Sequence, residues 1–131
     1  MRIKVGFTGT QIGMSEDQIN QLTSLLIRLN PSWFHHGDCI GADAEAHEVA
    51  LKLGIKIAIH PPRDNKKRAY CKGWKKRYYP EPYLDRDRLI VKETDLLIGA
   101  PKSNTEEIRS GTWYTIRYAR RIQKPMLILI P

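Results

Sequence analysis

Residues 95–100 read DLLIGA, one acid followed by five apolar or small residues. A short apolar run without alternation is typical of a strand that is buried on both faces, as in the centre of a parallel sheet. Parallel strands require long crossover connections, which are usually helices. The run therefore predicts an α/β fold.

The segments on either side of this run alternate between strand-like and helix-like patterns. The expected strands are residues 3–8, 33–36, 56–60, 95–100 and 126–130, and the expected helices are residues 16–29, 42–53, 83–93 and 111–121. The first helix is the clearest, because Ser15 is a good N-cap and apolar residues recur at spacings of three and four from Ile19 to Leu29. We expect a Rossmann-like, doubly wound α/β sheet of about five mainly parallel strands with helices on both faces.

Composition places the chain among ordinary globular proteins. Its 131 residues suit one domain, spanning 1–131, and no apolar run approaches the roughly 20 residues that cross a membrane. The N-terminus has no secretory pattern, and two cysteines without a paired spacing suit a reducing compartment. We expect a cytoplasmic protein with no membrane contact, no metal site and no cofactor.

Residues 61–82 form a basic segment, which we treat as a long insertion loop. They hold eight lysines and arginines and two acids, and so contribute six of the eight net positive charges. Tyrosines and a tryptophan are interleaved with the basic residues. Three interpretations of the segment are open: a lid over a ligand, a nucleic-acid contact or a solvated loop. As a lid it would offer phosphate contacts from Arg63, Lys66, Lys67 and Arg68.

Ligands of doubly wound sheets bind just beyond the carboxyl ends of the strands, so the loops there are the candidate site. After the first strand come Thr8, Gly9 and Thr10, in which the glycine permits a close backbone approach and the hydroxyls suit phosphate or ribose oxygens. A simple tight turn explains the same three residues equally well.

The second loop, HGDCIGAD, spans residues 36–43 between a strand and a helix. Gly37 and Gly41 form the turn, where helix amides attract anions. Asp38 and Asp43 are candidates to accept hydrogen bonds from ribose or a base. Helix capping, especially by Asp43, is the competing interpretation.

The third loop precedes the helix that begins at Gly111. Ser110, Gly111 and Thr112 form a helix N-terminus suited to phosphate, and Arg109 lies beside it. For the neighbouring Trp113 we favour packing in the core over stacking on a base.

In order along the chain, the motifs FTGT, HGDCIGAD, YLDRDRLIVKETDLLIGA, SGTWYTIRYA and KPMLIL resemble the SLOG superfamily. This Rossmann-like group contains the LOG phosphoribohydrolases, DprA and the small YspA/YpsA-like proteins, and the resemblance is closest to the last branch. It covers nearly the whole chain and implies that these loops bind a nucleotide or a nucleotide-derived ligand.

The resemblance is incomplete at the position that would carry catalysis. The LOG motif has a glutamate where this chain has Thr115, and threonine is no acid or base near neutral pH. Arg86 matches the arginine of the family, and Asp38 and Glu107 are the remaining catalytic candidates.

We therefore rank a non-catalytic binder of a small nucleotide ligand, acting as a sensor or a sink, above two alternatives. The first alternative is a LOG-like N-glycosidic hydrolase. The second is single-stranded nucleic-acid binding like that of DprA. We also expect a homo-oligomer.

Overall fold

The computed structural model describes residues 2–131. Its elements in chain order are β1 (Lys4–Gly9), α1 (Glu16–Leu29), β2 (Trp33–His36), α2 (Ala42–Lys52), β3 (Lys56–Ile59), β4 (Lys76–Arg77), α3 (Tyr83–Lys92), β5 (Leu96–Ala100), α4 (Gly111–Arg121) and β6 (Met126–Ile128). The six strands form one sheet in the order β4-β3-β2-β1-β5-β6, and every strand pair is parallel.

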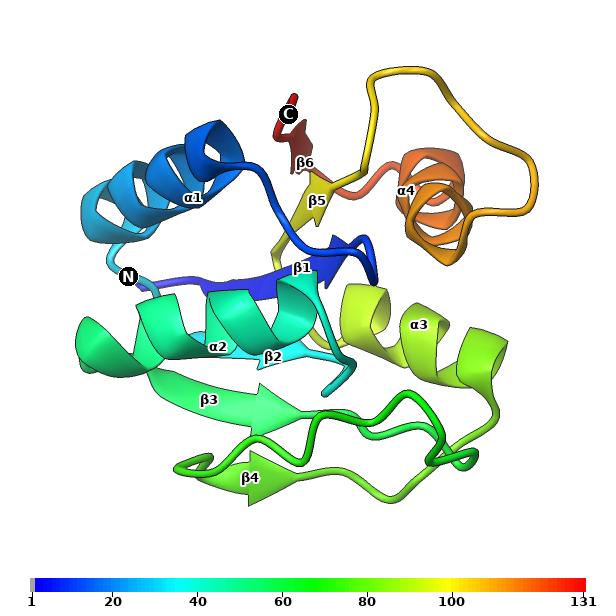
Figure 1. Cartoon of the computed structure of the whole chain (residues 1–131). Coiled ribbons are helices and arrows are strands. Elements are labelled where there is room, and N and C mark those ends of the chain that lie inside the picture. Colours follow the sequence, from blue (N-terminus) through cyan, green and yellow to red (C-terminus); the bar gives the residue numbers. More distant parts are fainter. Residues whose placement is uncertain (1) are drawn as a thin grey trace.

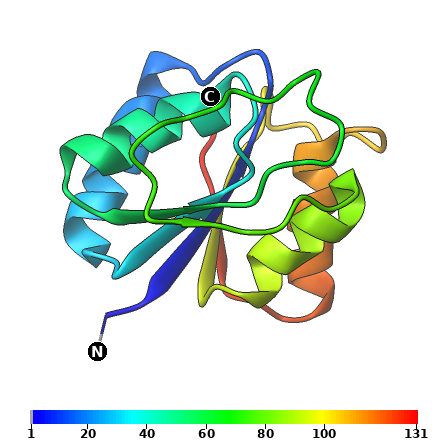
Figure 2. The same ribbon diagram turned by 90° about the horizontal axis from the view of Figure 1, so that it is seen from below.

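The predicted α/β class with helices on both faces is confirmed. Helices α1 and α2 cover one face of the sheet, and α3 and α4 cover the other (Figures 1 and 2). The sheet has six strands, so the expected number of about five is one too low. The extra strand is β4, two residues inside the basic segment, and two residues are too few to give a readable strand pattern.

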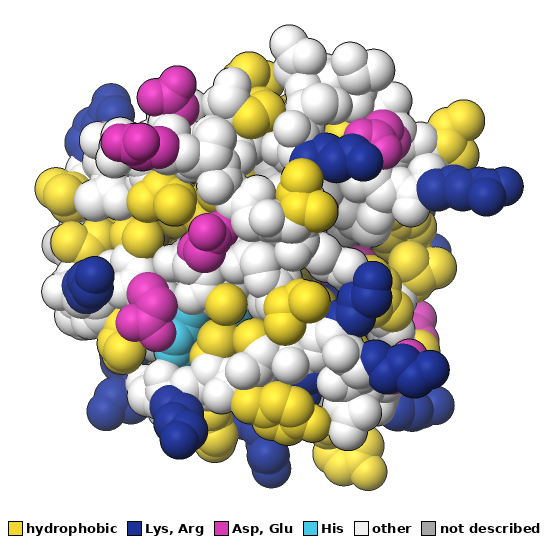
Figure 3. Space-filling view, viewed as in Figure 1, with side chains coloured by type: hydrophobic (Ala, Val, Ile, Leu, Met, Phe, Trp, Pro, Cys, Tyr) yellow, Lys and Arg dark blue, Asp and Glu magenta, His cyan; other side chains and the backbone are white. Residues whose placement is uncertain are grey.

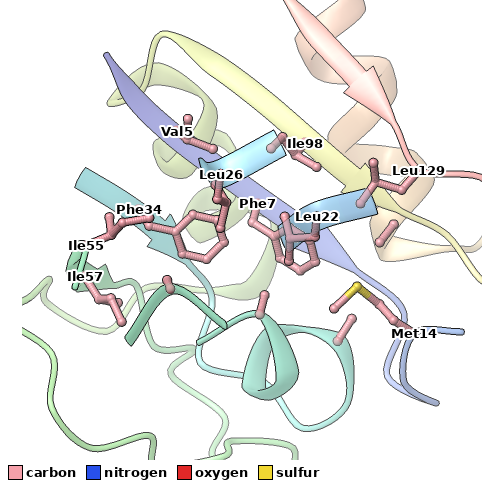
Figure 4. Packing of buried hydrophobic residues seen from close by; sticks show 14 of the residues in the cluster. Val5, Phe7, Met14, Leu22, Leu26, Phe34, Ile55, Ile57, Ile98 and Leu129 are labelled. Carbon is pink, nitrogen blue, oxygen red and sulfur yellow. The ribbon is translucent and has the colours of Figure 1, made fainter. Parts of the chain in front are cut away.

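The main core lies between the sheet and the pair α1 and α2. Phe7 and Phe34 meet there with ring centroids 5.8 Å apart, and Leu22 and Leu26 of α1 close over them (Figure 4). A smaller cluster around Ile90 packs under α3 and α4. Because both faces carry a core, the central strands β1 and β5 are largely buried.

Local capping fixes where α1 begins. The Ser15 side chain accepts the backbone N–H of Gln18 at 3.1 Å, and the Gln18 side chain accepts the N–H of Ser15 at 2.9 Å. This reciprocal capping box satisfies two backbone donors. The predicted bounds of this helix agree with the structure. Within residues 2–131, no helix combines the length and the apolar character needed to cross a membrane.

Candidate functional site

A crevice opens at the carboxyl edge of the sheet between β1 and β5. The chain leaves β1 toward α1 on one face and leaves β5 toward α4 on the other, so the two loops diverge (Figure 1). This is the topological switch point at which doubly wound sheets bind ligands. The crevice has a volume of about 330 Å³. Its lining residues are Gly9, Thr10, Gln11, Ile12, Tyr83, Lys102, Glu107, Arg109, Ser110, Gly111 and Thr112.

The N-terminus of α4 forms one wall of this crevice. The Ser110 side chain caps the helix by accepting the backbone N–H of Trp113 at 3.2 Å. Gly111 faces Tyr83 so closely that an added Cβ would lie 3.1 Å from the ring. The amides of Gly111 and Thr112 belong to the first helical turn, whose donors have no partner within the helix. Arg109 adds an exposed cation beside them.

Tyr83 adjoins the α4 N-terminus and is also part of the crevice lining. The guanidinium carbon of Arg86 lies 4.6 Å from the ring centroid, and Gln11 Nε2 donates to the tyrosine hydroxyl at 3.4 Å. The side chain is 39% exposed, which leaves part of the ring open to a ligand. Burial of the remainder raises the pKa of Tyr83 to about 12, so the hydroxyl stays protonated and neutral. A second hollow of about 350 Å³ adjoins the crevice and shares Tyr83 with it.

Arg86 lies beneath the crevice and ties the strand ends together. Its Nη1 donates to the carbonyls of Gly37 and His60, the latter at 3.0 Å, and its Nε donates to Asp87 Oδ1 at 2.8 Å. The side chain is 3% exposed. A Cβ at Gly37 would lie 2.3 Å from Nη1, so the glycine is what allows the guanidinium to enter.

Two buried carboxyls flank this guanidinium. Asp43 accepts the backbone N–H groups of Gly37 at 3.1 Å and Cys39 at 3.3 Å. Burial raises the pKa of Asp43 to about 7 and that of Asp87 to about 6, although Arg86 opposes both shifts. A hollow of about 10 Å³ borders these groups and shares Gly9, Tyr83 and Thr112 with the crevice lining.

The loop HGDCIGAD is folded inward. Asp38 has a positive φ of 55° and accepts Arg68 Nε at 2.8 Å and the backbone N–H of Cys71 at 2.9 Å. A Cβ at Gly41 would lie 2.2 Å from the carbonyl oxygen of Gln11, because the loop after β1 covers the start of α2. The structure thus places Gly41 and Asp38 outside the crevice lining.

The predicted ligand residues other than Asp38 and Gly41 fall into two groups. Residues 9, 10 and 109–112 line the crevice together. Thr8, Gly37, Asp43 and Arg86 surround the small hollow beneath it. No local sequence pattern distinguishes the two groups, because the direction of each side chain depends on contacts with distant segments.

Four lining residues were missed. Tyr83 follows a proline at a helix start, and Gln11, Ile12 and Lys102 lie in loops next to predicted site residues. Their positions directly after the first and fourth predicted strands, or at a helix start, are the only signals that point to them.

The basic segment reaches the crevice at one point. Lys67 Nζ donates to Gln11 Oε1 at 2.8 Å, at the rim. Arg68 is turned inward to Asp38, whereas Arg63 and Lys66 are exposed to solvent. Of the four predicted phosphate contacts, Lys67 is the one tied to a crevice residue by a described hydrogen bond.

His36, His47 and Cys71 place their donor atoms within 4.8 Å of one another. The imidazoles are already committed to a hydrogen-bond chain. His36 Nδ1 accepts the N–H of Asp38 at 2.9 Å, so its proton lies on Nε2, which donates to His47 Nδ1 at 2.9 Å. His47 Nε2 then donates to the Lys72 carbonyl at 2.6 Å. These hydrogen bonds leave no free nitrogen lone pair on either imidazole, so the two histidines do not suit metal binding.

Comparison with known proteins identifies the fold. The molybdenum cofactor binding protein of Rippkaea orientalis superposes with a TM-score of 0.75 at 16% identity, over 98% of this chain and 76% of that one. The Moco carrier protein of Chlamydomonas reinhardtii gives 0.73 at 16% identity, over 98% and 76%. DNA processing protein A of Helicobacter pylori gives 0.69 at 22% identity, over 96% and 64%. The chain shares the Rossmann-like α/β fold of these proteins. No protein-family model and no curated protein matches its sequence.

Within this fold, the three catalytic candidates differ in their access to a ligand. Asp38 and Arg86 are buried and paired internally. Glu107 lines the crevice, with Oε2 lying 3.5 Å from Lys102 Nζ. Thr115, at the position of the LOG glutamate, is buried, and its hydroxyl donates to the Gly111 carbonyl at 2.9 Å. Glu107 is thus the only candidate of the three whose side chain belongs to the crevice wall.

Proposed function

We propose that this protein binds a small nucleotide or nucleotide-derived ligand in the crevice between β1 and β5. The observation that carries the proposal is the meeting of three features in one crevice: the first-turn amides of α4, the cations Lys102 and Arg109, and the partly open ring of Tyr83. Helix amides with flanking cations suit a phosphate, and an aromatic ring suits a base or another flat ring system.

Titration calorimetry against mononucleotides, cyclic nucleotides, ADP-ribose derivatives and a molybdopterin compound tests the proposal. The last is included because two structures of this fold belong to proteins described as binding or carrying the molybdenum cofactor. We expect Arg109→Ala to weaken binding roughly tenfold, the effect of one lost charge-assisted contact.

Arg120→Ala is the matched control, because Arg120 is exposed near the far end of the same helix and outside the crevice lining. We expect it to leave affinity unchanged. If no member of the panel binds, or if both variants bind as the wild type does, the crevice is not the site.

Hydrolysis of an N-glycosidic bond is the enzymatic alternative, and Glu107 is the residue that geometry favours for it. A carboxylate at the crevice wall is able to assist departure of a base or to activate water. Release of free base from a nucleoside monophosphate, lost in Glu107→Gln, would support an enzyme. A released base with an unchanged rate in that variant would support the activity and reject the residue.

A second candidate function, nucleic-acid binding, is favoured by a surface on the sheet itself. Helices α3 and α4 pack mainly on β1, β5 and β6, so the start of β2 and β3 on that face is less covered. Register places Lys4, Trp33 and Lys56 in one row there, with Lys56 Nζ 4.8 Å from the Trp33 ring centroid. Basic side chains also gather along the β4 border (Figure 3).

Aromatic rings between lysines suit stacked bases and their phosphates. We expect Trp33→Ala to weaken the binding of a single-stranded oligonucleotide, and we expect that binding to fall steeply with salt. Ile27→Ala is the control, because Ile27 is 62% exposed and lies in α1, on the other face of the sheet. Salt-insensitive binding, or equal effects of the two substitutions, would remove this candidate.

A further inference from the structure

Strand β6 leaves one row of backbone groups unpaired. On the side facing β5, the N–H of Leu97 donates to the Pro125 carbonyl at 3.0 Å and the N–H of Leu129 donates to the Gly99 carbonyl at 2.8 Å. Backbone groups of successive strand residues point to opposite sides. Met126 and Ile128 therefore direct their N–H and C=O groups away from β5, where residues 2–131 provide no further strand.

The two edges of the sheet differ in how they are protected. At the opposite edge, β4 has only two residues, Lys76 and Arg77, both exposed and charged. Short length and charge are ordinary protections against pairing with another chain. Strand β6 reads Met-Leu-Ile and carries no charge. It is therefore the edge whose composition favours pairing.

A groove runs beside this edge, between β6 and α1. Its volume is about 500 Å³. Leu127 pairs in register with Ile98, which belongs to the core on the α1 side, so Leu127 points to the same side. It is 39% exposed. The lining residues are Asp17, Asn20, Gln21, Ser24, Leu25, Arg28, Leu127, Ile128 and Leu129.

We propose that β6 and the groove beside α1 bind a second copy of this chain across a two-fold axis. With the axis at Leu127, Met126 lies opposite the partner's Ile128, and Ile128 lies opposite the partner's Met126. Each of these two pairs exchanges two N–H···O=C bonds in an antiparallel ladder. Leu127 and the partner's Leu127 form the close pair between them, and each fills the groove that the other leaves open.

The charges on α1 fit the same axis. Asp17 and Arg28 line the groove near opposite ends of the helix. When two copies of α1 lie antiparallel, Asp17 faces the partner's Arg28 and Gln21 faces the partner's Ser24. A surface that is complementary to itself in this way is what a two-fold dimer requires.

Leu127→Lys tests the contact at the axis. Light scattering over a range of concentrations is expected to show a dimer for the wild type and a monomer for the variant, because two lysines would meet at the two-fold. Ile27→Lys is the matched control: Ile27 is a 62% exposed apolar residue of α1 outside the groove lining, and this variant is expected to stay dimeric. A monomeric wild type, or a dimer that survives Leu127→Lys, would overturn the proposal.

A charge exchange tests the orientation of α1. Asp17→Arg is expected to raise the dimer dissociation constant about tenfold, because symmetry repeats the repulsion twice. Adding Arg28→Asp is expected to restore dimerisation, which a general loss of stability would not do. In hydrogen exchange, the amides of Met126 and Ile128 are expected to be slow in the dimer and fast after dilution. Fast exchange of both amides in a proven dimer would place the interface elsewhere.

Discussion

Replacing Arg86 by methionine is expected to destabilise the fold more than any surface substitution. The guanidinium is 3% exposed and donates to the carbonyls of Gly37 and His60 and to the carboxylate of Asp87. Methionine has a similar length and no donor, so it leaves two carbonyls and a carboxyl without their partner.

Breaking a buried ion pair by removing one partner costs about 3–5 kcal/mol. Protonation of the Asp87 carboxyl reduces this free-energy cost, since burial has already raised its pKa to about 6. We therefore expect a loss of about 3 kcal/mol from the free energy of unfolding, near the lower end of that range. For a domain of this size, the loss corresponds to a fall in Tm of roughly 10 °C.

Urea unfolding followed by circular dichroism measures the change, at pH 5 and at pH 8. The loss should be larger at pH 8, where Asp87 is ionised and has no cation beside it. Arg86→Lys is the comparison, because it keeps the charge and cannot make all three contacts at once. A loss below about 1 kcal/mol for Arg86→Met at pH 8 would mean that the buried network does not hold the strand ends together.

Three further results are expected. Burial raises the pKa of Asp43 to about 7, above the value near 4 in an unfolded chain. The stability that Asp43 contributes is therefore full below pH 4 and is lost as the pH rises to 7, by at most about 1.4 kcal/mol per pH unit. Asp43→Asn should flatten this pH dependence of the free energy of unfolding, measured by urea titrations at several pH values. Gly41→Ala should lower the Tm strongly, because its Cβ would meet the Gln11 carbonyl, whereas Gly54→Ala, with open space around it, should cost only about 1 kcal/mol of backbone strain. Burial raises the pKa of the Cys71 thiol, so alkylation by iodoacetamide at pH 8 should be slow in the folded protein and rapid in urea; equally rapid reaction in both states would contradict the burial.

The basic segment illustrates how a local pattern divides into different roles once the chain is folded. Its sequence suggests a single charged loop. In the structure, Arg68 is held by Asp38, Lys67 is held at the crevice rim by Gln11, and Lys76 and Arg77 extend the sheet as β4. The density of positive charge in the sequence therefore suits a phosphate-bearing partner. The contacts in the folded chain decide which of these charged side chains remain free to bind one.

The sequence by itself determined the layers of this protein. The apolar run at 96–100, the capping pattern at Ser15 and the serine-glycine start at 110–111 are local signals, because periodicity and caps depend on residues a few positions apart. They were sufficient for the alternation of strands and helices, the doubly wound class and the use of the α4 N-terminus as one wall of a crevice.

Only the tertiary structure decided which polar residues face the crevice and which are buried beneath it. Asp38 accepts a hydrogen bond from Arg68, thirty positions away, and Arg86 donates one to the carbonyl of Gly37, forty-nine positions away. A buried polar group must find a hydrogen-bond partner, and that partner is supplied by whichever distant segment packs against it. The inward fold of HGDCIGAD, the role of Tyr83 and the open edge at β6 follow from that packing, which no local pattern encodes.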